Sequence, residues 1–513
     1  MSLGCCFDII FKFQPRHPST PTSGPGPSSP RFSSLLINMM AAKAIRPARL
    51  LNRTAHIVPG QLRVTELTFE VPLNHSNPSV GSLKLFGRQV TKHDTPIVPR
   101  TDSEQEEFYR KPYLVYLEGG PGFGNKEPQD HQLTKTALDK GYTLLLLDYR
   151  GTGLSTPINQ PHLATLGGPQ QQANYLKHFR ADSIVRDAEA VRLCLTSGYP
   201  ESHKKWSIFG QSYGGFVALT YLSQFPQGLR EVFLTGGLAP VKRTVEEVYT
   251  ALYKKVIQRN EAYYRKFPED VERVRQVAKY LQEKSPLLPG GGEFTVERLL
   301  GIGLCLGMNG GLDLIHSNIL KMTMDLDQFG FITRAAGAAF EGLIPFDTNP
   351  IYAVLHESIY TNGPDRASDW AAHRVGKALS ESEPGLSWLS PVGKALSAGT
   401  AKPLYFSGEM VYPSHFDCYP ELKDMKETAE ILAKCDDWPQ LYDLDQLSRN
   451  EVPVYAASYV EDMYVDADFA RETAKAVKGT KVFETNVMYH GALRAKTEEV
   501  LGQLFKLRDD TLD

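Results

Sequence analysis

Short runs of consecutive apolar residues, separated by helical segments, dominate the first half of the chain. Four such runs, each followed closely by glycine, lie at residues 113–117, 143–147, 206–209 and 231–234. In one intervening segment, apolar residues repeat at the spacing of a helix face: Ile184, Ala188, Val191 and Leu195. Apolar runs that do not alternate with polar residues are typical of strands buried on both faces. The pattern therefore predicts a mostly parallel sheet with helices on both sides.

This rhythm stops near Pro240 and resumes near Val452. The intervening residues favour helices, and one predicted helix face carries Val271, Val274, Ala278 and Leu281. We therefore expect a helical cap domain inserted into a larger core. Its predicted bounds are residues 240–450, between core segments at residues 61–239 and 451–513.

The strands at the two ends of the core follow from the same reasoning. Two antiparallel strands are expected at residues 67–71 and 83–90, because a turn rich in Asn, Ser and Pro separates two β-rich runs. The last two core strands are expected at residues 452–459 and 481–488. A closing helix is predicted near residues 495–507.

Residues 1–60 differ in composition from the rest of the chain. Residues 17–34 are dense in proline, serine, threonine and glycine, and Asp8 is the one acidic residue before Glu66. Such a segment buries too little apolar surface to offset the entropy of ordering, so we expect a disordered tail. Its acid-poor composition also resembles a mitochondrial transit peptide. We expect a cytoplasmic protein, with mitochondrial import, or a translated start at Met39 or Met40, as alternatives.

Residues 210–214 read Gly-Gln-Ser-Tyr-Gly, a G-x-S-x-G motif. The motif directly follows one predicted strand and directly precedes a predicted helix at residues 216–223. Flanking glycines permit a sharp turn between strand and helix, and that turn exposes the serine hydroxyl. This context favours Ser212 as a nucleophile over an ordinary glycine-rich turn. It also places the N–H of Tyr213 where it can donate to an oxyanion.

A second glycine-rich segment, Gly119-Gly120-Pro121-Gly122, follows an earlier predicted strand. In folds with a serine at such a turn, the second oxyanion donor comes from this position. Glycine lets a carbonyl oxygen approach the backbone closely, and Pro121 has no N–H to donate. We therefore expect Gly119 or Gly120 to complete an oxyanion hole with Tyr213.

A serine nucleophile needs a base, and the base needs an acid that orients it, in the chain order serine, acid, histidine. Of 13 histidines, His490 alone lies between the last predicted strand and the closing helix. Three carboxylates follow the preceding strand, namely Glu461, Asp462 and Asp466; we favour Asp462, with Asp466 second. These positions predict a serine hydrolase of the α/β-hydrolase fold, a mostly parallel sheet flanked by helices with the cap inserted.

Composition argues against several other classes. The chain has 56 basic and 59 acidic residues, a balance that gives no reason to expect nucleic acid or an anionic membrane as a partner. No apolar run reaches the roughly 18 residues of a membrane span. The six cysteines are scattered, and the sequence has no C-x-x-C pair and no H-E-x-x-H motif, so we expect no metal. The glycines at residues 119–124 lack dinucleotide-binding spacing, and no cofactor is expected.

Three segments together carry a resemblance to a known family. They are Gly119-Gly120-Pro121-Gly122, Asp148-Tyr149-Arg150-Gly151-Thr152-Gly153 and Gly210-Gln211-Ser212-Tyr213-Gly214-Gly215. The combination resembles the proline iminopeptidases, or prolyl aminopeptidases, which are serine peptidases of the α/β-hydrolase fold. The likeness covers roughly residues 67–507. It implies that Asp462 and His490 are the catalytic acid and base, and that the substrate is a small peptide whose N-terminal proline is released.

The resemblance also implies that carboxylates of the cap hold the free amine of the substrate. The segment at residues 408–416 resembles one such segment, which makes Glu409 the first candidate. Glu357 is the second, and Glu341 is the fallback. A charged amine buried under a cap requires a paired anion, and an internal amide offers no such charge. These carboxylates would therefore enforce cleavage at the N-terminus.

The chain departs from the family pattern at two positions near the predicted site. Glu118 stands where the family loop usually begins with histidine, and Tyr213 stands where tryptophan often follows the serine. Both departures bear on the strictness of a proline preference. Two alternatives stay open: a related hydrolase that cleaves an ester or amide of a small metabolite, and a non-catalytic binding protein. The sequence does not fix the oligomeric state.

Overall fold

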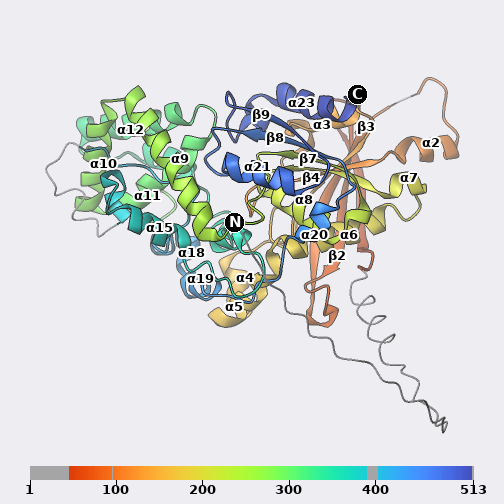
Figure 1. Cartoon of the computed structure of the whole chain (residues 1–513), viewed down its shortest axis with the longest axis horizontal. Helices are drawn as coiled ribbons and strands as arrows, with labels where there is room; N and C mark the ends of the chain where they lie inside the picture. Colours follow the sequence, from red (N-terminus) through yellow and green to blue (C-terminus); the bar gives the residue numbers. More distant parts are fainter. Residues whose placement is uncertain (1–44, 95, 390–401, 511–513) are drawn as a thin grey trace, which may run out of the picture. The chain divides into compact units, whose positions relative to one another are not determined.

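A nine-stranded sheet forms the centre of the fold, in the order β1-β2-β3-β5-β4-β6-β7-β8-β9 (Figure 1). The computed structural model describes residues 45–94, 96–389 and 402–510. The strands are β1 Arg49–Val58, β2 Leu62–Pro72, β3 Ser82–Lys92, β4 Tyr113–Leu117, β5 Thr143–Leu147, β6 Trp206–Gln211, β7 Leu229–Thr235, β8 Val454–Tyr459 and β9 Thr480–Thr485. From β5 across to β9 every neighbouring pair is parallel, whereas β1, β2 and β3 are antiparallel.

Strand β1 lies within the first 60 residues, so the folded part begins earlier than the composition indicates. Its side chains are almost all exposed, and it is joined to β2 along its length by backbone pairing. A strand without a buried face leaves no alternation to recognise in the sequence. Residues 1–44, which include Met39, Met40 and most of the predicted transit-peptide composition, lie outside the described residues.

Strand β4 shows why its sequence is apolar at every position. Leu114 and Tyr116 pack into a cluster that includes helices α3 (Thr134–Asp139) and α23 (Thr497–Asp509). Val115 and Leu117 pack on the opposite face, against α6 (Ala181–Leu195) and α8 (Tyr213–Gln224). Successive side chains of a strand point to opposite faces, so helices on both sides require apolar residues throughout. Figure 1 shows α23 and α3 on one side of the sheet and α8 and α6 on the other.

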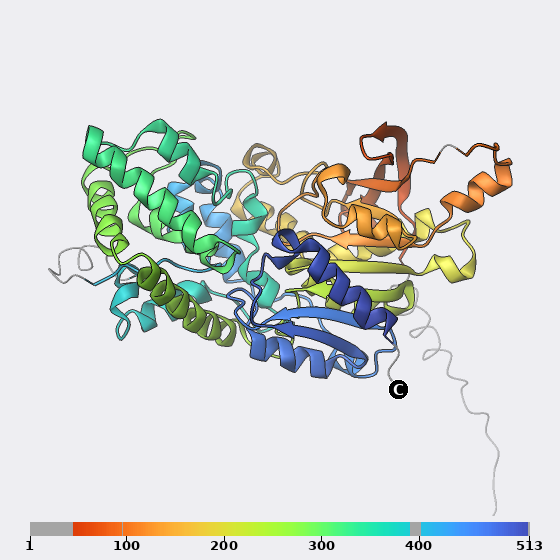
Figure 2. The ribbon, with the colours of Figure 1, turned by 90° about the horizontal axis from the view of Figure 1, so that it is seen from above.

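Helices replace strands between β7 and β8, the stretch for which the sequence predicts a cap. Among its described residues, pairing is limited to an isolated bridge between Leu287 and Glu293. The α-helices of this stretch are α9 Val245–Lys266, α10 Asp270–Lys284, α11 Val296–Gly301, α12 Gly311–Phe329, α13 Arg334–Glu341, α14 Pro350–Val354, α15 Ala371–Leu379, α17 His415–Cys418, α18 Pro420–Lys423, α19 Lys426–Ala433 and α20 Leu444–Ser448. Figure 2 shows α9 to α12, in green, gathered beside the strands rather than over them.

Local sequence signals explain where the longest cap helix begins. The hydroxyl of Thr244 accepts a hydrogen bond from the N–H of Glu247, and the carboxylate of Glu247 accepts one from the N–H of Thr244. This reciprocal pair satisfies two N–H groups that have no partner within the helix, which fixes the start of α9. Helix α9 then packs against α15, and Lys255 on α9 pairs with Glu461 after β8.

The parallel strands bring four predicted site segments to one edge of the sheet. Glu118 follows β4, Ser212 follows β6, Asp462 follows β8 and His490 follows β9. The carboxyl ends of neighbouring parallel strands share an edge, and ligands bind at that edge in open α/β sheets. The cap is joined to the core beside this edge, where Thr428 of α19 donates a 2.9 Å hydrogen bond to Gln172 of α5 (Pro169–Leu176). None of the described helices is long and apolar enough to cross a membrane.

Candidate active site

Ser212 occupies a strained turn between β6 and α8. Its φ and ψ angles are 54° and −123°, a conformation that side chains rarely adopt. A Cβ on Gly210 would lie 2.4 Å from the carbonyl oxygen of Gly214, and a Cβ on Gly214 would lie 1.9 Å from that of Leu117. Glycine is therefore required at both flanking positions, which explains the G-x-S-x-G spacing. The turn lifts the serine hydroxyl off the strand.

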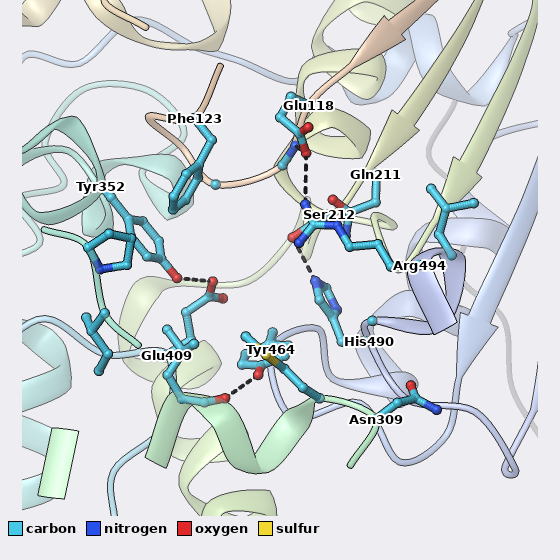
Figure 3. Close-up of a pocket in the computed structure, with 18 of the residues that line it drawn as sticks. Glu118, Phe123, Gln211, Ser212, Asn309, Tyr352, Glu409, Tyr464, His490 and Arg494 are labelled. Atoms are coloured by element: carbon cyan, nitrogen blue, oxygen red, sulfur yellow. Dashed lines mark hydrogen bonds and ion pairs between the residues drawn. The ribbon is translucent and has the colours of Figure 1, made fainter. Parts of the chain in front are cut away.

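Ser212, His490 and Asp462 form a continuous hydrogen-bonded chain. Figure 3 shows its contact between Ser212 and His490. Nε2 of His490 lies 2.8 Å from Oγ of Ser212, and Nδ1 lies 2.7 Å from Oδ2 of Asp462. With the Nδ1 proton donated to the carboxylate, Nε2 is left as the acceptor that faces the hydroxyl. The structure thus brings together the three residues that the sequence selects, in the geometry of a nucleophile, a base and an orienting acid.

The loop after β8 distinguishes Asp462 from its two competitors. The other oxygen of Asp462, Oδ1, accepts the N–H groups of Tyr464 at 2.8 Å and Val465 at 3.1 Å, which fixes the carboxylate. Asp466 instead caps helix α21 (Ala467–Ala476) by accepting two of its backbone N–H groups. Glu461 pairs with Lys255 at 3.1 Å. Of these three carboxylates, only that of Asp462 contacts His490 among the described residues.

The environment of His490 sets its proton affinity. Burial lowers the pKa of His490, but the charge of Asp462 and its hydrogen bond outweigh burial and raise the pKa above the usual value. The charge of Glu409 adds to this rise, whereas Arg494 opposes it. The ring of Tyr464 packs edge-on against the imidazole, with centroids 4.5 Å apart. These contacts hold the imidazole in one orientation and favour its charged form.

The glycine loop after β4 lies directly against the serine. A Cβ on Gly119 would come within 3.1 Å of the Cβ of Ser212. The N–H of Gly119, however, already donates a 2.8 Å hydrogen bond to Oε1 of the buried Glu118. Among the described residues, the N–H groups of Gly120 and Tyr213 have no acceptor. The geometry therefore offers these two as oxyanion donors and engages Gly119 elsewhere.

A cavity of about 530 Å³ opens at Ser212 and His490. Glu409 lines it, and Oε1 of Glu409 accepts a 2.7 Å hydrogen bond from the hydroxyl of Tyr352 (Figure 3). Much of the remaining wall near the cap is apolar; it includes Phe123, Leu304, Met308, Leu343, Ile344 and Pro345. Glu118 also lines the cavity, but its carboxylate already accepts the N–H of Gly119. The carboxylate of Glu409 and the hydroxyl of Ser212 thus share a chamber with a largely apolar wall, a combination that suits a small ligand with a positive charge.

The structure does not bring Glu357 or Glu341 to this cavity. Both oxygens of Glu357 accept backbone N–H groups at the start of α15, from Ala371 and Ala372. Burial raises the pKa of Glu357 to about 7. Glu341 accepts the N–H of Gly290 on another part of the cap. Of the three predicted amine-binding carboxylates, Glu409 alone lines the described cavity, because the other two are occupied by backbone donors.

A cluster of possible metal ligands lies outside the cavity. It consists of Glu269, Asp270 and His316, whose ligand atoms lie within 4.8 Å of one another. The oxygens of Asp270 already interact with Tyr263, Arg273 and His316, and His316 stacks on a phenylalanine ring. These contacts account for the cluster as a polar network in the cap.

Similarity to known proteins agrees with this geometry. Residues 112–282 match a family model described as alpha/beta hydrolase fold. The chain is 41% identical to proline iminopeptidase aneH of Aspergillus aculeatus, over 93% of this chain and 100% of that protein. It is 42% identical to a proline iminopeptidase of Aeromonas sobria, over 86% of this chain and 96% of that protein. The chain belongs to the proline iminopeptidase family. The predicted family and fold class are thereby confirmed.

Two residues of this proline iminopeptidase site were not selected from the sequence. Tyr352 belongs to α14. A Cβ on Gly122 would lie 2.9 Å from the backbone nitrogen of Tyr352, so the close packing of the glycine loop against α14 requires glycine at residue 122. Arg494 lies four residues after His490 on the short helix α22 (Ala492–Ala495) and lines the cavity. The helical spacing after His490 was the available signal for Arg494. Tyr352 had no local signal, since its position depends on a distant loop.

Proposed function

We propose that the protein is a serine aminopeptidase that releases N-terminal proline from short peptides through an acyl-enzyme. One observation carries the proposal: the carboxylate of Glu409 and the hydroxyl of Ser212 line a single cavity. A free α-amine is largely charged near neutral pH, and burial of that charge needs a paired anion. The carboxylate would therefore fix the amine of the first residue, and with it the first peptide bond, at the nucleophile.

In the first half of the reaction, the proton of Ser212 passes through His490 to the leaving amine. His490 Nε2 accepts the proton of Ser212 as Oγ attacks the carbonyl carbon of proline. The N–H groups of Gly120 and Tyr213 donate to the oxygen that becomes negative. Asp462 stabilises the imidazolium that forms. His490 then gives its proton to the leaving amine, the carbon–nitrogen bond breaks, and a prolyl ester of Ser212 is left.

The second half repeats these steps with water. A water molecule gives a proton to His490 and attacks the ester carbonyl, and His490 returns that proton to Oγ of Ser212. Free proline leaves and the enzyme is regenerated. An apolar chamber favours a compact aliphatic ring beside the carboxylate, since the ring brings apolar area and no second charge.

The direct test compares proline-β-naphthylamide with the alanine and leucine naphthylamides and with a short-chain p-nitrophenyl ester. We expect the proline amide to have the highest kcat/KM, and Ser212→Ala to abolish turnover. Unchanged activity in Ser212→Ala would contradict the proposal. Cleavage of the ester alone would instead favour a hydrolase of small metabolites, and failure to react with a fluorophosphonate would favour a non-catalytic protein.

Substitution of Glu409 separates recognition of the amine from the chemistry. Glu409→Gln keeps the shape and removes the charge, so turnover of the proline amide should fall by about a hundredfold while ester hydrolysis persists. Glu341→Gln is the matched control, because its carboxylate accepts a backbone N–H away from the cavity. Equal losses on both substrates in Glu409→Gln would show that this carboxylate does not bind the amine.

A further inference from the structure

The active-site cavity continues past His490 to a wall formed by Gly491, Leu493, Arg494 and Ala495. Figure 3 shows Arg494 and Glu409 on opposite sides of Ser212. In the proposed reaction, His490 gives its proton to the departing amine, so the departing part of the peptide has to lie alongside His490. The amine of proline lies on the Glu409 side. The wall that carries Arg494 therefore faces the leaving peptide, an argument that rests on the proposed function.

The guanidinium of Arg494 is only weakly engaged by protein groups. Its Nη2 lies 3.5 Å from Oε1 of Glu118, at the long limit of a hydrogen bond, and the described residues offer the guanidinium no other partner. The side chain of Arg494 is 55% exposed, whereas that of Glu118 is 5% exposed. Arginine has five N–H donors in a fixed fork. Glu118 thus orients the cation from the buried side and leaves most of its donors for a ligand.

A second polar group on the same stretch of wall lacks a partner. Asn309 lines the cavity, and its side-chain oxygen Oδ1 is buried without a hydrogen-bond partner among the described residues. The backbone of Asn309 lies near Gly491, so this amide belongs to the side of the cavity that carries Arg494. This side of the cavity therefore offers one unpartnered acceptor and one available cation. A C-terminal amino-acid residue carries the matching groups, an N–H and a carboxylate.

We propose that Arg494 binds the terminal carboxylate of the leaving peptide, which makes the enzyme selective for short proline peptides. Arginine binds carboxylates through two parallel N–H bonds, and such charge-assisted bonds are stronger than neutral ones. An extended chain advances about 3.5 Å per residue, so each added residue moves the carboxylate further from Arg494. Glu409 and Arg494 would then recognise the two ends of one small substrate.

The experiment measures kcat/KM for prolyl-glycine and prolyl-glycyl-glycine, each as the free acid and as the C-terminal amide. At low ionic strength we expect the acid to exceed the amide by about tenfold for at least one length, because solvent weakens but does not remove an exposed ion pair. Arg494→Gln should bring the ratio close to one, and Arg494→Lys should keep part of it. Lys496→Gln is the matched control, since Lys496 pairs with Glu499 and does not line the cavity.

The acid-to-amide ratio distinguishes recognition from a structural role. If Arg494 only supported Glu118, substitution would change the acid and the amide equally, and the proposal would be overturned. A ratio near one for both lengths in the unmodified enzyme would overturn it as well, as would a ratio that survives Arg494→Gln. Turnover of proline-β-naphthylamide, which has no carboxylate, reports the proposed function separately. If the enzyme cleaves proline-β-naphthylamide but does not distinguish peptide acids from peptide amides, the proposed function stands and carboxylate binding by Arg494 is overturned.

Discussion

The hydroxyl of Tyr352 donates a 2.7 Å hydrogen bond to Oε1 of Glu409, which joins α14 to the loop before α17 at the wall of the active site. Tyr352 is buried, and its ring packs edge-on against Phe123 of the glycine loop, with centroids 5.1 Å apart. One tyrosine therefore links the oxyanion loop of the core to the carboxylate that we expect to bind the amine.

Removal of this hydroxyl should weaken recognition of the amine. Tyr352→Phe keeps the ring but frees Glu409, so we expect KM for proline-β-naphthylamide to rise about fivefold, or about 1 kcal/mol. The ester should be affected much less. Tyr280→Phe, on helix α10, removes a hydroxyl that is not part of the cavity and serves as the control. A rise in KM that is equal for ester and amide would show that Tyr352 does not act through recognition of the amine by Glu409.

Loss of the Asp462 charge should reduce turnover far more than binding. Asp462→Asn removes the acceptor that orients Nδ1 of His490, and kcat should fall by about a thousandfold or more. Asp466→Ala offers the comparison, because Asp466 caps α21 and should cost about 1 kcal/mol of stability with little change in kcat. Steady-state kinetics and thermal unfolding of both variants check the assignment. Comparable kcat values would remove Asp462 from its proposed role.

The pH dependence follows from the raised pKa of His490. The base is active when neutral, so kcat/KM should fall as the pH drops through that pKa, with a midpoint above 6.5. Glu409 helps to stabilise the charged imidazole. Glu409→Gln should therefore move the midpoint to lower pH, as measured with the neutral ester. Glu341→Gln should leave the midpoint in place. An upward shift of the midpoint in Glu409→Gln would contradict the stabilisation of the charged imidazole by Glu409.

Two glycine substitutions should change stability in opposite directions. Gly214→Ala would force a Cβ to 1.9 Å from the carbonyl oxygen of Leu117, so we expect a loss of about 2 kcal/mol or more. Gly502 lies in helix α23 with no atom near its Cβ position, and Gly502→Ala should add about 0.5–1 kcal/mol. Thermal or denaturant unfolding of the two proteins measures both effects. A stable Gly214→Ala protein would mean that the turn relaxes more easily than its contacts indicate.

The sequence by itself determined the features that depend on neighbours along the chain. A strand followed by G-x-S-x-G specifies the turn at Ser212, because a Cβ on Gly210 would clash with Gly214 of the same turn. The position of His490 after the last strand follows from the strict order of βα units. The order of these motifs also carried the resemblance to the family, which the comparisons confirmed.

The tertiary structure decided which carboxylates and backbone N–H groups already have hydrogen-bond partners and which are left for a substrate. The resemblance named Glu409, Glu357 and Glu341 as candidates in that order, and the sequence could not show which of them line the cavity. In the structure, backbone N–H groups bind Glu357 and Glu341, and Glu409 lines the cavity. The N–H of Gly119 likewise donates to Glu118, which is why we propose Gly120 as the oxyanion donor. Hydrogen-bond partners between distant segments have no local pattern, because the fold, and not the sequence spacing, brings them together.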